Sequence, residues 1–345
     1  MMHTIRLLMI GLGNVGQGLL TILSEQRQAL EASYGLRFAI VGVNDLRMGS
    51  VADSSGIPFE NLLAAATKGD LRTIPAQKKD LTVEEMLAGL EFDVLVEASY
   101  TDLRTGEPAT SYIRQALRSG RHVVTTNKGP IALHYPELQA IAEQNNVQIG
   151  FEGTVMSGTP AIFLGMKWLK AAGIYRIQGI LNGTTNFILT KMEEGKDYAT
   201  ALAEAQRLGY AEADPSGDVE GYDAAGKVVI LSNVLMEKPI TMQDVERQGI
   251  TQLTPGDIEQ ARREGKRWKL IGSLELTEGT IKASVKPLAL PLSNPLAQVM
   301  GATNAITYAT RYLGDVTLVG AGAGRLETGY ALLADILSIY RKGSI

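Results

Sequence analysis

The chain has 345 residues, of which 45% are hydrophobic and 20% are charged, and its formal net charge is −4. At roughly 150 residues per domain this length predicts two domains, and the composition is that of a globular protein with a core. The slight negative charge disfavours a protein that coats nucleic acid or binds membranes through basic residues. No apolar run reaches the roughly 18–20 residues that a membrane-spanning helix needs. We therefore expect neither a nucleic acid nor a membrane as a partner.

Residue types that many enzymes use for catalysis are scarce in this sequence. Cysteine is absent, which excludes disulfides, thiolate metal sites and a cysteine nucleophile. The three histidines, His3, His122 and His134, lack the spacing of metal ligands, so a zinc enzyme and a histidine-based triad are disfavoured. Any chemistry must rely on Lys, Asp, Glu, Ser or Thr, or on a bound cofactor. We predict no cleavable signal at the N-terminus and expect a cytoplasmic protein.

The first third of the chain alternates strand and helix patterns. An apolar strand is predicted at residues 5–10, followed by a glycine-rich turn and one long helix that ends near Gly35. Thr82 and Glu85 have the spacing of a capping box that opens a short helix. Further strands are predicted at 38–43, 93–98 and 122–126, and a further helix at 108–119. This alternation is typical of a parallel sheet with helices on its faces.

The rest of the chain has a different order of elements. Strands are predicted at 147–151, 175–181, 268–276, 281–288 and 305–310, and a helix at 160–171. Because the last of these strands follow one another with only turns between them, we predict a mixed or antiparallel sheet. The end returns to the first style, with a strand at 316–319, a glycine turn at 320–324 and a helix at 328–340. We expect this tail to pack on the first domain, so that residues 1–135 and 315–345 form one domain and 136–314 form a second, α+β domain.

Three glycines, Gly11, Gly13 and Gly16, stand between the first predicted strand and helix. In a dinucleotide-binding turn the first glycine permits the tight turn, the second lets the pyrophosphate approach the backbone, and the third lets helix and strand pack closely. The start of the helix, here Asn14 and Val15, then faces the phosphates. The pattern predicts a Rossmann-type doubly wound α/β domain that binds a dinucleotide. A purely structural glycine turn is the alternative.

The second predicted strand is followed by an acid, Asp45, which in such domains binds the ribose 2′-hydroxyl. Arg47 lies two residues further on and could instead hold a 2′-phosphate. We therefore expect NADP or NAD as the cofactor, with a slight preference for NADP. The alternative is that both side chains are solvated loop charges.

Five carboxylates lie between Glu212 and Asp223, and Lys227 follows four residues later. If the residues after Asp223 form a helix, Lys227 shares its face with Asp223 and otherwise with apolar residues. An isolated ammonium is costly among apolar side chains, so a buried lysine usually has partners or a function. Lys227 is therefore a candidate catalytic or substrate-binding residue. A structural buried ion pair and a surface lysine with a buried stem are the alternatives.

Lys128 follows the predicted strand at 122–126, at the carboxyl edge of a parallel sheet, where ligands bind in doubly wound folds. By itself a lysine after a strand is typical of a solvated loop, but the nearby glycine turn favours a functional role. An enzyme that interconverts an alcohol and a carbonyl needs a group that exchanges a proton with the oxygen. Where histidine is scarce, a lysine can provide that proton.

Several segments together resemble homoserine dehydrogenases, and the resemblance extends over most of the chain. Besides the glycine turn, these segments are Thr125-Thr126-Asn127-Lys128, the run from Phe151 to Pro160, Leu181-Asn182-Gly183-Thr184-Thr185-Asn186-Phe187, the run from Glu212 to Lys227, and the glycine turn at 320–324. The Asn-Gly-Thr-Thr-Asn and Asp-Ala-Ala-x-Lys runs are the most specific of them.

This resemblance implies an enzyme that reduces L-aspartate 4-semialdehyde to L-homoserine with a nicotinamide cofactor, on the route to threonine, methionine and isoleucine. Lys227 would donate the proton, Asp223 would orient it, and Lys128 would lie close by in the site. Residues implied to bind the substrate are Glu212, Asp218, Gly183, Thr184 and Tyr210. Lys128, Ser99 and Gly324 would contact the cofactor. A homodimer formed through the middle sheet is also implied, as is a short, monofunctional form with neither a kinase nor a C-terminal regulatory domain.

The resemblance further implies a monovalent cation, Na or K, held by oxygen atoms of a loop. The implied ligands are Glu152, Val155, Ser157 and Thr159, and hard cations prefer such oxygen ligands. The alternative is a plain strand-to-helix loop, with Thr159 as the helix cap and Pro160 in the first turn.

Two other functions fit the same pattern. One is a different NAD(P)-dependent amino-acid oxidoreductase of this architecture. An aspartate semialdehyde dehydrogenase is disfavoured, because its acyl-transfer chemistry needs a cysteine. The other is a non-catalytic NAD(P)-binding sensor. A sensor requires only the glycine turn, so Lys227 and its neighbouring carboxylates favour an enzyme.

Overall fold

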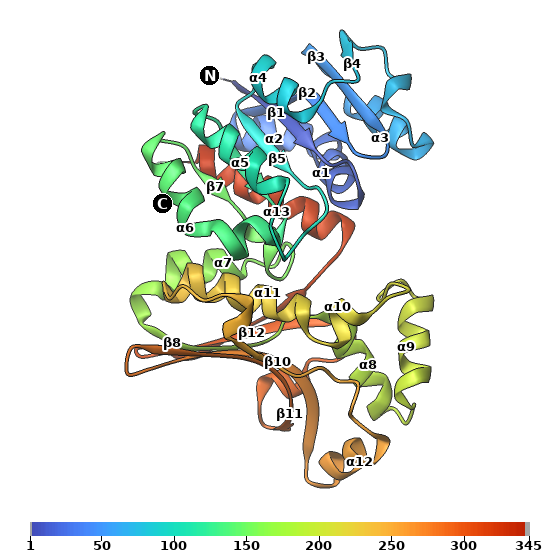
Figure 1. The fold of residues 1–345 in the computed structure, drawn as a ribbon, viewed down its shortest axis with the longest axis vertical. Coiled ribbons are helices and arrows are strands. Elements are labelled where there is room, and N and C mark those ends of the chain that lie inside the picture. The colour runs from blue at the N-terminus through green and yellow to red at the C-terminus, as the bar shows by residue number, and fades with distance from the viewer. Residues whose placement is uncertain (1, 342–345) are drawn as a thin grey trace. The chain divides into compact units, whose positions relative to one another are not determined.

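The computed structural model describes residues 2–341, whose internal contacts divide the chain into two compact units (Figure 1). Unit 1 takes the residues up to Gly158 and those from Gly324 onward, and unit 2 comprises Thr159–Ala323. The predicted α/β fold class is confirmed, because unit 1 contains a largely parallel sheet and unit 2 a mixed one. Within residues 2–341, none of the helices combines the length and the hydrophobicity that a bilayer crossing requires.

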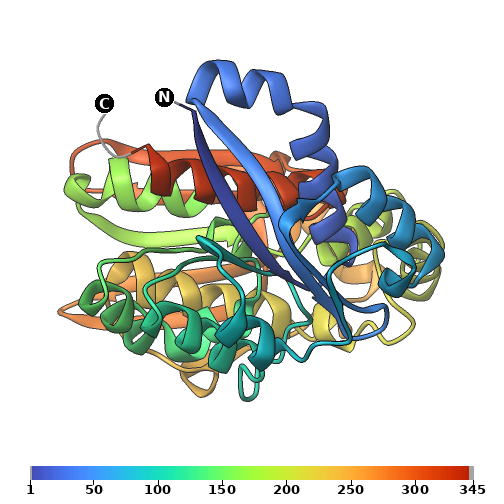
Figure 2. The ribbon, with the colours of Figure 1, turned by 90° about the horizontal axis from the view of Figure 1, so that it is seen from above.

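Unit 1 is built around a sheet with the strand order β4-β3-β2-β1-β5-β6-β7. Its strands are β1 (His3–Ile10), β2 (Leu36–Asp45), β3 (Gly49–Ile57), β4 (Lys78–Lys79), β5 (Val94–Glu97), β6 (His122–Thr125) and β7 (Ile149–Gly150). Strands β2, β1, β5, β6 and β7 are parallel, β3 joins β2 antiparallel, and β4 joins β3 antiparallel. Figure 2 shows β1 and β2 side by side in blue. The chain order reverses between β1 and β5, which makes this pair the switch point where such sheets bind ligands.

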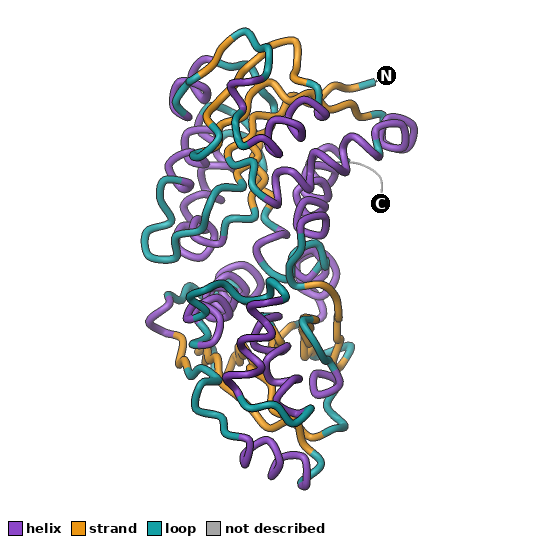
Figure 3. Tube along the Cα trace, turned by 90° about the vertical axis from the view of Figure 1, so that its right-hand side faces the viewer, coloured by secondary structure: helices purple, strands orange, loops and turns teal. Residues whose placement is uncertain are grey.

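Helices lie on both sides of this sheet, as Figure 3 shows in purple. They are α1 (Asn14–Glu25), α2 (Arg27–Tyr34), α3 (Phe59–Lys68), α4 (Val83–Gly89), α5 (Ala109–Arg118), α6 (Lys128–Gln144) and α13 (Arg325–Tyr340), with short turns η1 (Leu71–Thr73) and η2 (Glu152–Thr154). The predicted capping box forms at Thr82 and Glu85. Apolar side chains of β1, β2, α1 and α13 make up most of the core. Gly18 lets α1 approach α13, because a Cβ there would lie 1.9 Å from the carbonyl oxygen of Arg325.

Unit 2 is built around a sheet with the order β13-β12-β8-β10-β11-β9. Its strands are β8 (Ile174–Ile180), β9 (Val245–Arg247), β10 (Lys266–Thr277), β11 (Thr280–Pro291), β12 (Thr303–Thr310) and β13 (Gly314–Ala321). All neighbours are antiparallel except β11 and β9. The sheet is therefore mixed, as the sequence predicts.

The helical segments of unit 2 span at most 11 residues each. They are α7 (Ala161–Phe163), η3 (Leu164–Leu169), η4 (Lys170–Ala172), α8 (Gly183–Glu193), α9 (Tyr198–Arg207), α10 (Ser216–Val219), α11 (Tyr222–Leu231), η5 (Ser232–Met236), η6 (Met242–Asp244), α12 (Pro255–Arg263) and η7 (Pro295–Gln298). Helix α8 packs on β10 and β12, and α11 packs on β9, β10 and β11. Both helices, which carry predicted site residues, are thus anchored on the same sheet.

Two predicted helices differ from the structure. The predicted long first helix is interrupted at Gln26 and forms the two helices α1 and α2. Because α1 packs on α13 whereas α2 packs on β2, the chain changes direction between them. The predicted helix at 160–171 is replaced by α7, a wide π-helical turn and a 3₁₀ turn. Gly165 lies in that wide turn, where a Cβ would stand 2.7 Å from the Leu235 side chain.

The boundaries of the units differ from the predicted ones at 135/136 and 314/315. Residues 136–158 join unit 1, because α6 continues to Gln144 and β7 pairs with β6. Residues 315–323 join unit 2, because β13 pairs with β12 along its whole length. Only helix α13 of the tail belongs to unit 1.

Candidate active site

The glycine turn connects β1 to α1 at the switch point of the unit 1 sheet. Gly11 has a φ of +91°, and a Cβ there would lie 2.4 Å from the carbonyl oxygen of Ala98. A Cβ on Gly16 would lie 2.7 Å from the carbonyl oxygen of Gly11, whereas Gly13 has no protein atom within 4 Å of that position. Gly13 and Asn14 are exposed, and the first turn of α1 contains no acidic residue. The N-terminus of α1, including Val15, is therefore accessible to a phosphate group.

Asp45 ends β2 beside this turn. Its carboxylate accepts hydrogen bonds from the backbone N–H groups of Leu12 at 2.9 Å, Arg47 at 3.0 Å and Met48 at 3.2 Å. Arg47 itself is exposed. Of the two side chains predicted to contact the adenosine ribose, the structure thus fixes Asp45 at the glycine turn and leaves Arg47 in solvent.

Lys128 and Ser99 follow β6 and β5 at the carboxyl edge of the same sheet. Lys128 is the first residue of α6, and the side chain of the preceding Asn127 caps that helix by accepting a hydrogen bond from the N–H of Gly129 at 3.2 Å. Ser99 donates from its N–H, at 3.0 Å, and from its hydroxyl to one carboxyl oxygen of Glu97. Glu97 is fully buried and is not among the predicted site residues. Its signal in the sequence is a lone acid inside an apolar strand.

Lys227 lies in α11 and is 7% exposed, so its predicted burial is confirmed. Its ammonium donates to the carbonyl oxygen of Leu181 at 2.6 Å and to the carboxylate of Asp223 at 2.7 Å. Asn182 donates to the same oxygen of Asp223 at 3.0 Å and to Asp218 at 2.6 Å. The predicted pair Lys227–Asp223 thus forms, and Asn182, which is not a predicted site residue, joins it to Asp218.

The carboxyl group of Asp218 lies half-buried at the far side of Asn182. Burial raises its pKa, and the charge of Asp223 adds to this rise, while the hydrogen bond from Asn182 and the charge of Lys227 oppose it. Asp218 therefore has an environment in which a cationic group brought close to it would be strongly favoured.

The other predicted substrate residues surround the start of α8. Gly183 is the first residue of that helix, and a Cβ on it would lie 2.6 Å from the carbonyl oxygen of Ala302. The hydroxyl of Thr184 donates to the carbonyl oxygen of Tyr210 at 2.5 Å. Glu212 is exposed on the loop before α10. The structure therefore brings Gly183, Thr184 and Tyr210 together, whereas the exposed Glu212 stands apart from their hydrogen bonds.

The predicted cation loop contains a buried carboxylate. Glu152 is 1% exposed, and its backbone N–H donates to the carboxylate of Asp335 at 3.0 Å. Val155 is also buried, and the hydroxyl of Ser157 lies 2.7 Å from that of Thr328. These contacts all lie within unit 1.

Thr159, the fourth predicted ligand, belongs to unit 2. Its hydroxyl donates to the carbonyl oxygen of Ala321 at 3.0 Å, and Pro160 rather than Thr159 immediately precedes α7. The alternative in which Thr159 caps a helix is therefore wrong. Among the described residues, no group of three or more His, Cys, Asp and Glu side chains could hold a metal ion.

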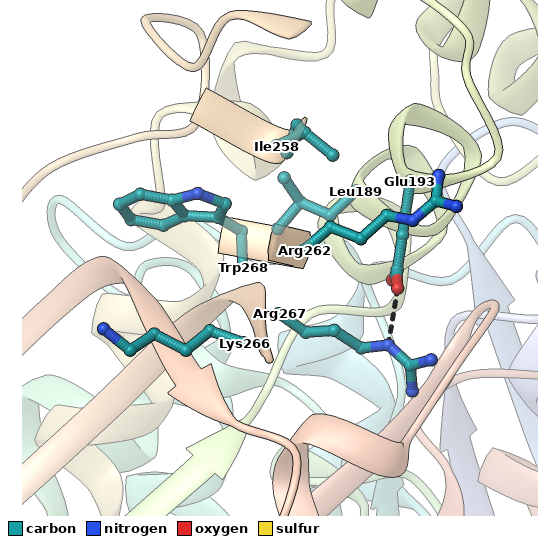
Figure 4. Close-up of a pocket in the computed structure, with 7 residues that line it drawn as sticks. All are labelled: Leu189, Glu193, Ile258, Arg262, Lys266, Arg267 and Trp268. Atoms are coloured by element: carbon teal, nitrogen blue, oxygen red, sulfur yellow. Dashed lines mark hydrogen bonds and ion pairs between the residues drawn. The ribbon is translucent and has the colours of Figure 1, made fainter. Parts of the chain in front are cut away.

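A small pocket in unit 2 involves none of the predicted site residues (Figure 4). Its lining residues are Leu189, Glu193, Ile258, Arg262, Lys266, Arg267 and Trp268. Arg267 pairs with Glu193 at 2.6 Å, as the dashed line in Figure 4 marks, and Lys266 pairs with Glu264 at 2.8 Å. Because these cations already have carboxylate partners, the pocket offers little attraction to an anionic ligand.

A second buried lysine, Lys269 of β10, is 1% exposed. Its ammonium nitrogen donates to the side-chain oxygen of Asn186 at 2.9 Å and to the carbonyl oxygen of Val299 at 2.5 Å. Burial lowers the pKa of Lys269 to about 8. Asn186 belongs to the Asn-Gly-Thr-Thr-Asn run, so Lys269 braces the helix that carries Gly183 and Thr184.

A parallel sheet with an accessible dinucleotide turn, together with a second unit that holds a buried lysine among carboxylates, defines a nicotinamide-dependent dehydrogenase. The family model for the homoserine dehydrogenase NAD binding domain matches residues 11–152, and the model for homoserine dehydrogenase matches residues 160–337. The chain therefore belongs to the homoserine dehydrogenase family and is an NAD(P)-dependent oxidoreductase.

Individual relatives agree with this assignment. The chain is 46% identical to an NAD(+)-dependent homoserine dehydrogenase of Pseudomonas canavaninivorans, over 98% of this chain and 97% of that protein. It is 37% identical to a homoserine dehydrogenase of Methanocaldococcus jannaschii, over 97% and 98% of the two chains. Among solved structures, a hyperthermophilic archaeal homoserine dehydrogenase mutant in complex with NADPH is similar with a TM-score of 0.85, at 32% identity and 99% coverage of both chains.

The lowered pKa of Lys269 predicts a specific pH dependence of stability. Between pH about 8 and 10.5 the unfolded lysine still holds a proton that the folded protein has lost, so the free energy of unfolding rises with pH in this window. Below pH 8 the lysine is protonated in both the folded and the unfolded protein, so the free energy of unfolding does not change with pH through this group. Across the whole window the rise in the free energy of unfolding amounts to about 3 kcal/mol. Urea unfolding at pH 7.5 and pH 10 measures it.

The variant Lys269→Met lacks the titrating group and should lose this rise, while Lys170→Met, which removes an exposed lysine, should keep it. Equal pH dependence of the unfolding free energy in wild type and Lys269→Met would contradict the prediction.

Proposed function

We propose that the protein reduces the aldehyde of L-aspartate 4-semialdehyde to the alcohol of L-homoserine, with Lys227 as the proton donor. A reduced nicotinamide, when bound, would supply the hydride that the aldehyde carbon accepts. The ammonium of Lys227 gives its proton to the oxygen, and the neutral amine then regains a proton from water. In the cell this reaction serves threonine, methionine and isoleucine synthesis in the cytoplasm.

The environment of the Lys227 ammonium is the observation that carries this proposal. Leu181 and Asp223 accept two of its three N–H bonds, and the third has no protein acceptor among the described residues. The carboxylate of Asp223 forms an ion pair with this ammonium at 2.7 Å and fixes the direction of one N–H bond. Asn182 holds Asp223 in place. A carbonyl oxygen brought within hydrogen-bond distance of the third N–H would meet a positioned general acid.

The residues at the start of α8 and in the following acidic segment are proposed to bind the ends of the substrate. Asp218 and Glu212 supply negative charge for the substrate's ammonium group. Gly183 and Thr184 begin a helix, whose N-terminal N–H groups attract the substrate's carboxylate. The carbonyl oxygen of Tyr210 accepts a hydrogen bond from Thr184, and Tyr210 is proposed to line the substrate site beside it.

The residues of unit 1 fit a dinucleotide. The proposed contacts are Gly11, Gly13, Asn14, Val15, Gly16, Asp45, Ser99, Lys128 and Gly324. The free space beside Gly13 and the acid-free first turn of α1 suit a pyrophosphate. The choice of cofactor is proposed to follow Asp45 rather than Arg47, because the fixed carboxylate can bind a 2′-hydroxyl and would repel a 2′-phosphate. We therefore propose NAD in place of the NADP that the sequence slightly favoured, and the name of the Pseudomonas relative agrees with this choice.

A homodimer is proposed through the sheet of unit 2. Its edge strand β13 is largely exposed, with Val319 52% exposed and, in the preceding turn, Leu313 60% exposed. An uncovered apolar edge strand readily pairs with a second chain. Light scattering of the purified protein should give twice the chain mass of 37.1 kDa, and a monomer mass would overturn this proposal.

A monovalent cation is proposed at the loop that begins with the buried Glu152. The side-chain and backbone oxygens of Glu152, Val155, Ser157 and Thr159 are the proposed ligands. Hard cations prefer such oxygen ligands, and Glu152 provides a buried carboxylate among them. Replacing Na and K in the assay by a bulky organic cation should lower turnover, and unchanged turnover would contradict the proposal.

Replacing the proposed proton donor should abolish turnover without releasing the cofactor. Lys227→Ala is expected to lower kcat for aspartate semialdehyde by about 10²–10⁴-fold, the usual contribution of general acid catalysis. NADH binding, followed by its fluorescence, should stay within about twofold, because Lys227 lies in unit 2 and the glycine turn in unit 1. The matched control is Lys286→Ala, which removes a lysine of β11 that pairs with Glu246 of β9. This variant should keep its turnover. Retention of more than about a tenth of the wild-type kcat by Lys227→Ala would exclude the proton-donor role.

Asp45 should control the choice of cofactor. Asp45→Ser is expected to lower kcat/KM with NADH by about tenfold, roughly 1.4 kcal/mol, because a charged hydrogen bond to the ribose is lost. With NADPH the same change should cost little or raise kcat/KM. Arg47→Ala serves as the comparison, since it should leave the NADH values unchanged. A wild-type protein that prefers NADPH, and loses this preference in Arg47→Ala, would reverse the assignment.

A further inference from the structure

Glu97 is a fully buried acid for which the proposed reaction has no use. It ends β5 and pairs in register with Ile10, the last residue of β1 before the glycine turn. The turn rests on the residues that follow Glu97, since a Cβ on Gly11 would lie 2.4 Å from the carbonyl oxygen of Ala98 and 2.9 Å from the nitrogen of Ser99. The carboxyl group of Glu97 therefore lies at the switch point of the sheet, beneath the loops that form its carboxyl edge.

Both oxygens of this carboxyl group are hydrogen-bonded to neighbouring loops. One accepts from the N–H of Ser99 at 3.0 Å and from the Ser99 hydroxyl, on the loop after β5. The other accepts from the hydroxyl of Thr125 at 3.0 Å, at the end of β6. The Thr125 oxygen in turn accepts from the N–H of Asn127 at 3.0 Å. Glu97 thus links the two loops through a short chain of hydrogen bonds.

Asn127 continues this chain to the residues on either side of Lys128. Its side-chain oxygen accepts from the N–H of Gly129 at 3.2 Å, and its amide nitrogen donates to the carbonyl oxygen of Tyr100 at 2.9 Å. Gly129 has little freedom to shift, because a Cβ there would lie 2.4 Å from the carbonyl oxygen of Asp102. The backbone of Lys128 is therefore held between two residues whose positions depend on the network that begins at Glu97.

We propose that Glu97 is a positioning residue, whose carboxyl group holds the loops after β5 and β6 together and thereby sets the place of Lys128 at the carboxyl edge of the sheet. The inference rests on the proposed contact of Lys128 with the cofactor, on which turnover depends. In this arrangement Glu97 contacts neither substrate nor cofactor, and it acts only through Ser99, Thr125 and Asn127.

Burial of a carboxyl group is expensive, and an apolar side chain would fill the same place in a core at lower cost. Burial also raises the pKa of Glu97, while the hydrogen bonds from Ser99, Thr125 and Asn127 oppose the rise. What such a carboxyl group provides, and an apolar side chain cannot, is a set of hydrogen bonds with a fixed geometry. Glutamine can reproduce most of them, because it has one accepting oxygen and one donating nitrogen in the same positions, whereas alanine can reproduce none.

A double-mutant cycle tests the proposal. Glu97→Ala and Glu97→Gln are made in the wild-type chain and in Lys128→Ala, and kcat is measured with saturating aspartate semialdehyde and NADH. In the wild-type chain, Glu97→Ala should lower kcat by about tenfold or more, since small displacements of an active-site group have such effects. Glu97→Gln should stay within about threefold of wild type. In Lys128→Ala, Glu97→Ala should cost less than about twofold further, because residues that act through one another are not additive.

A matched control separates positioning from general loss of stability. Asp93 lies just before β5, at its opposite end, and pairs with Arg6 at 2.9 Å. Asp93→Ala should lower the unfolding temperature and leave kcat unchanged at temperatures where the protein is folded. If Glu97→Ala does not fold, Thr125→Val replaces it, since this change keeps the shape of the side chain and removes only the hydroxyl that links Glu97 to Asn127.

The outcomes are distinct. The positioning role is overturned if Glu97→Ala lowers kcat equally with and without Lys128. It is also overturned if Glu97→Gln is as impaired as Glu97→Ala. In both cases the proposed role of Lys128 remains. A wild-type kcat in Lys128→Ala overturns the role of Lys128 itself, and the inference built on it. Thr125→Val should show the same dependence on Lys128 as Glu97→Ala, and an additive effect there counts against the network.

Discussion

The geometry of unit 2 depends on an ammonium group that is buried in a helix of apolar residues. Lys227 sits in α11, where the residues from Ala224 to Leu231 are all buried. An unpaired charge in such a place would cost several kcal/mol, and the two hydrogen bonds to Asp223 and to the Leu181 carbonyl offset that cost. Asp223 belongs to α11 itself, and Leu181 directly follows strand β8. The lysine therefore connects the helix to the sheet on which it packs.

Asn182 extends this constraint to the rest of the unit. Its amide nitrogen donates to both Asp218 and Asp223, and its oxygen accepts from the N–H of Thr185 at 2.9 Å and so caps α8. One side chain thus orients two carboxylates and begins the helix that carries Gly183. On the other side of α8, Lys269 and Asn186 fix the same helix from beneath. The polar groups of this region are connected, which limits how far any one of them can move.

The sequence predicted those features that depend on short-range patterns. The glycine turn, the capping box at Thr82 and the apolar face around Lys227 can each be found from residues close together in the chain. Strands β3, β4 and β9 were not predicted, whereas the other strands were located to within about three residues. The break at Gln26 and the place of β13 could not be found in this way, because they depend on which distant element each segment packs against. Glu97 was missed for the same reason. A single acid in a strand has no pattern, and its meaning comes from Ser99, Thr125 and Asn127 around it.

Unit 1 is discontinuous in the chain, because α13 joins it only after the whole of unit 2 has been traversed. During translation the residues up to Gly158 are synthesised long before this helix. Until α13 is present, the surface of α1 around Gly18 stays uncovered, including residues such as Leu19 that are buried in the folded unit. Domains that can finish folding as they leave the ribosome have no such delay. The first unit of this protein cannot close until α13 has been synthesised, so its completion must follow the synthesis of unit 2.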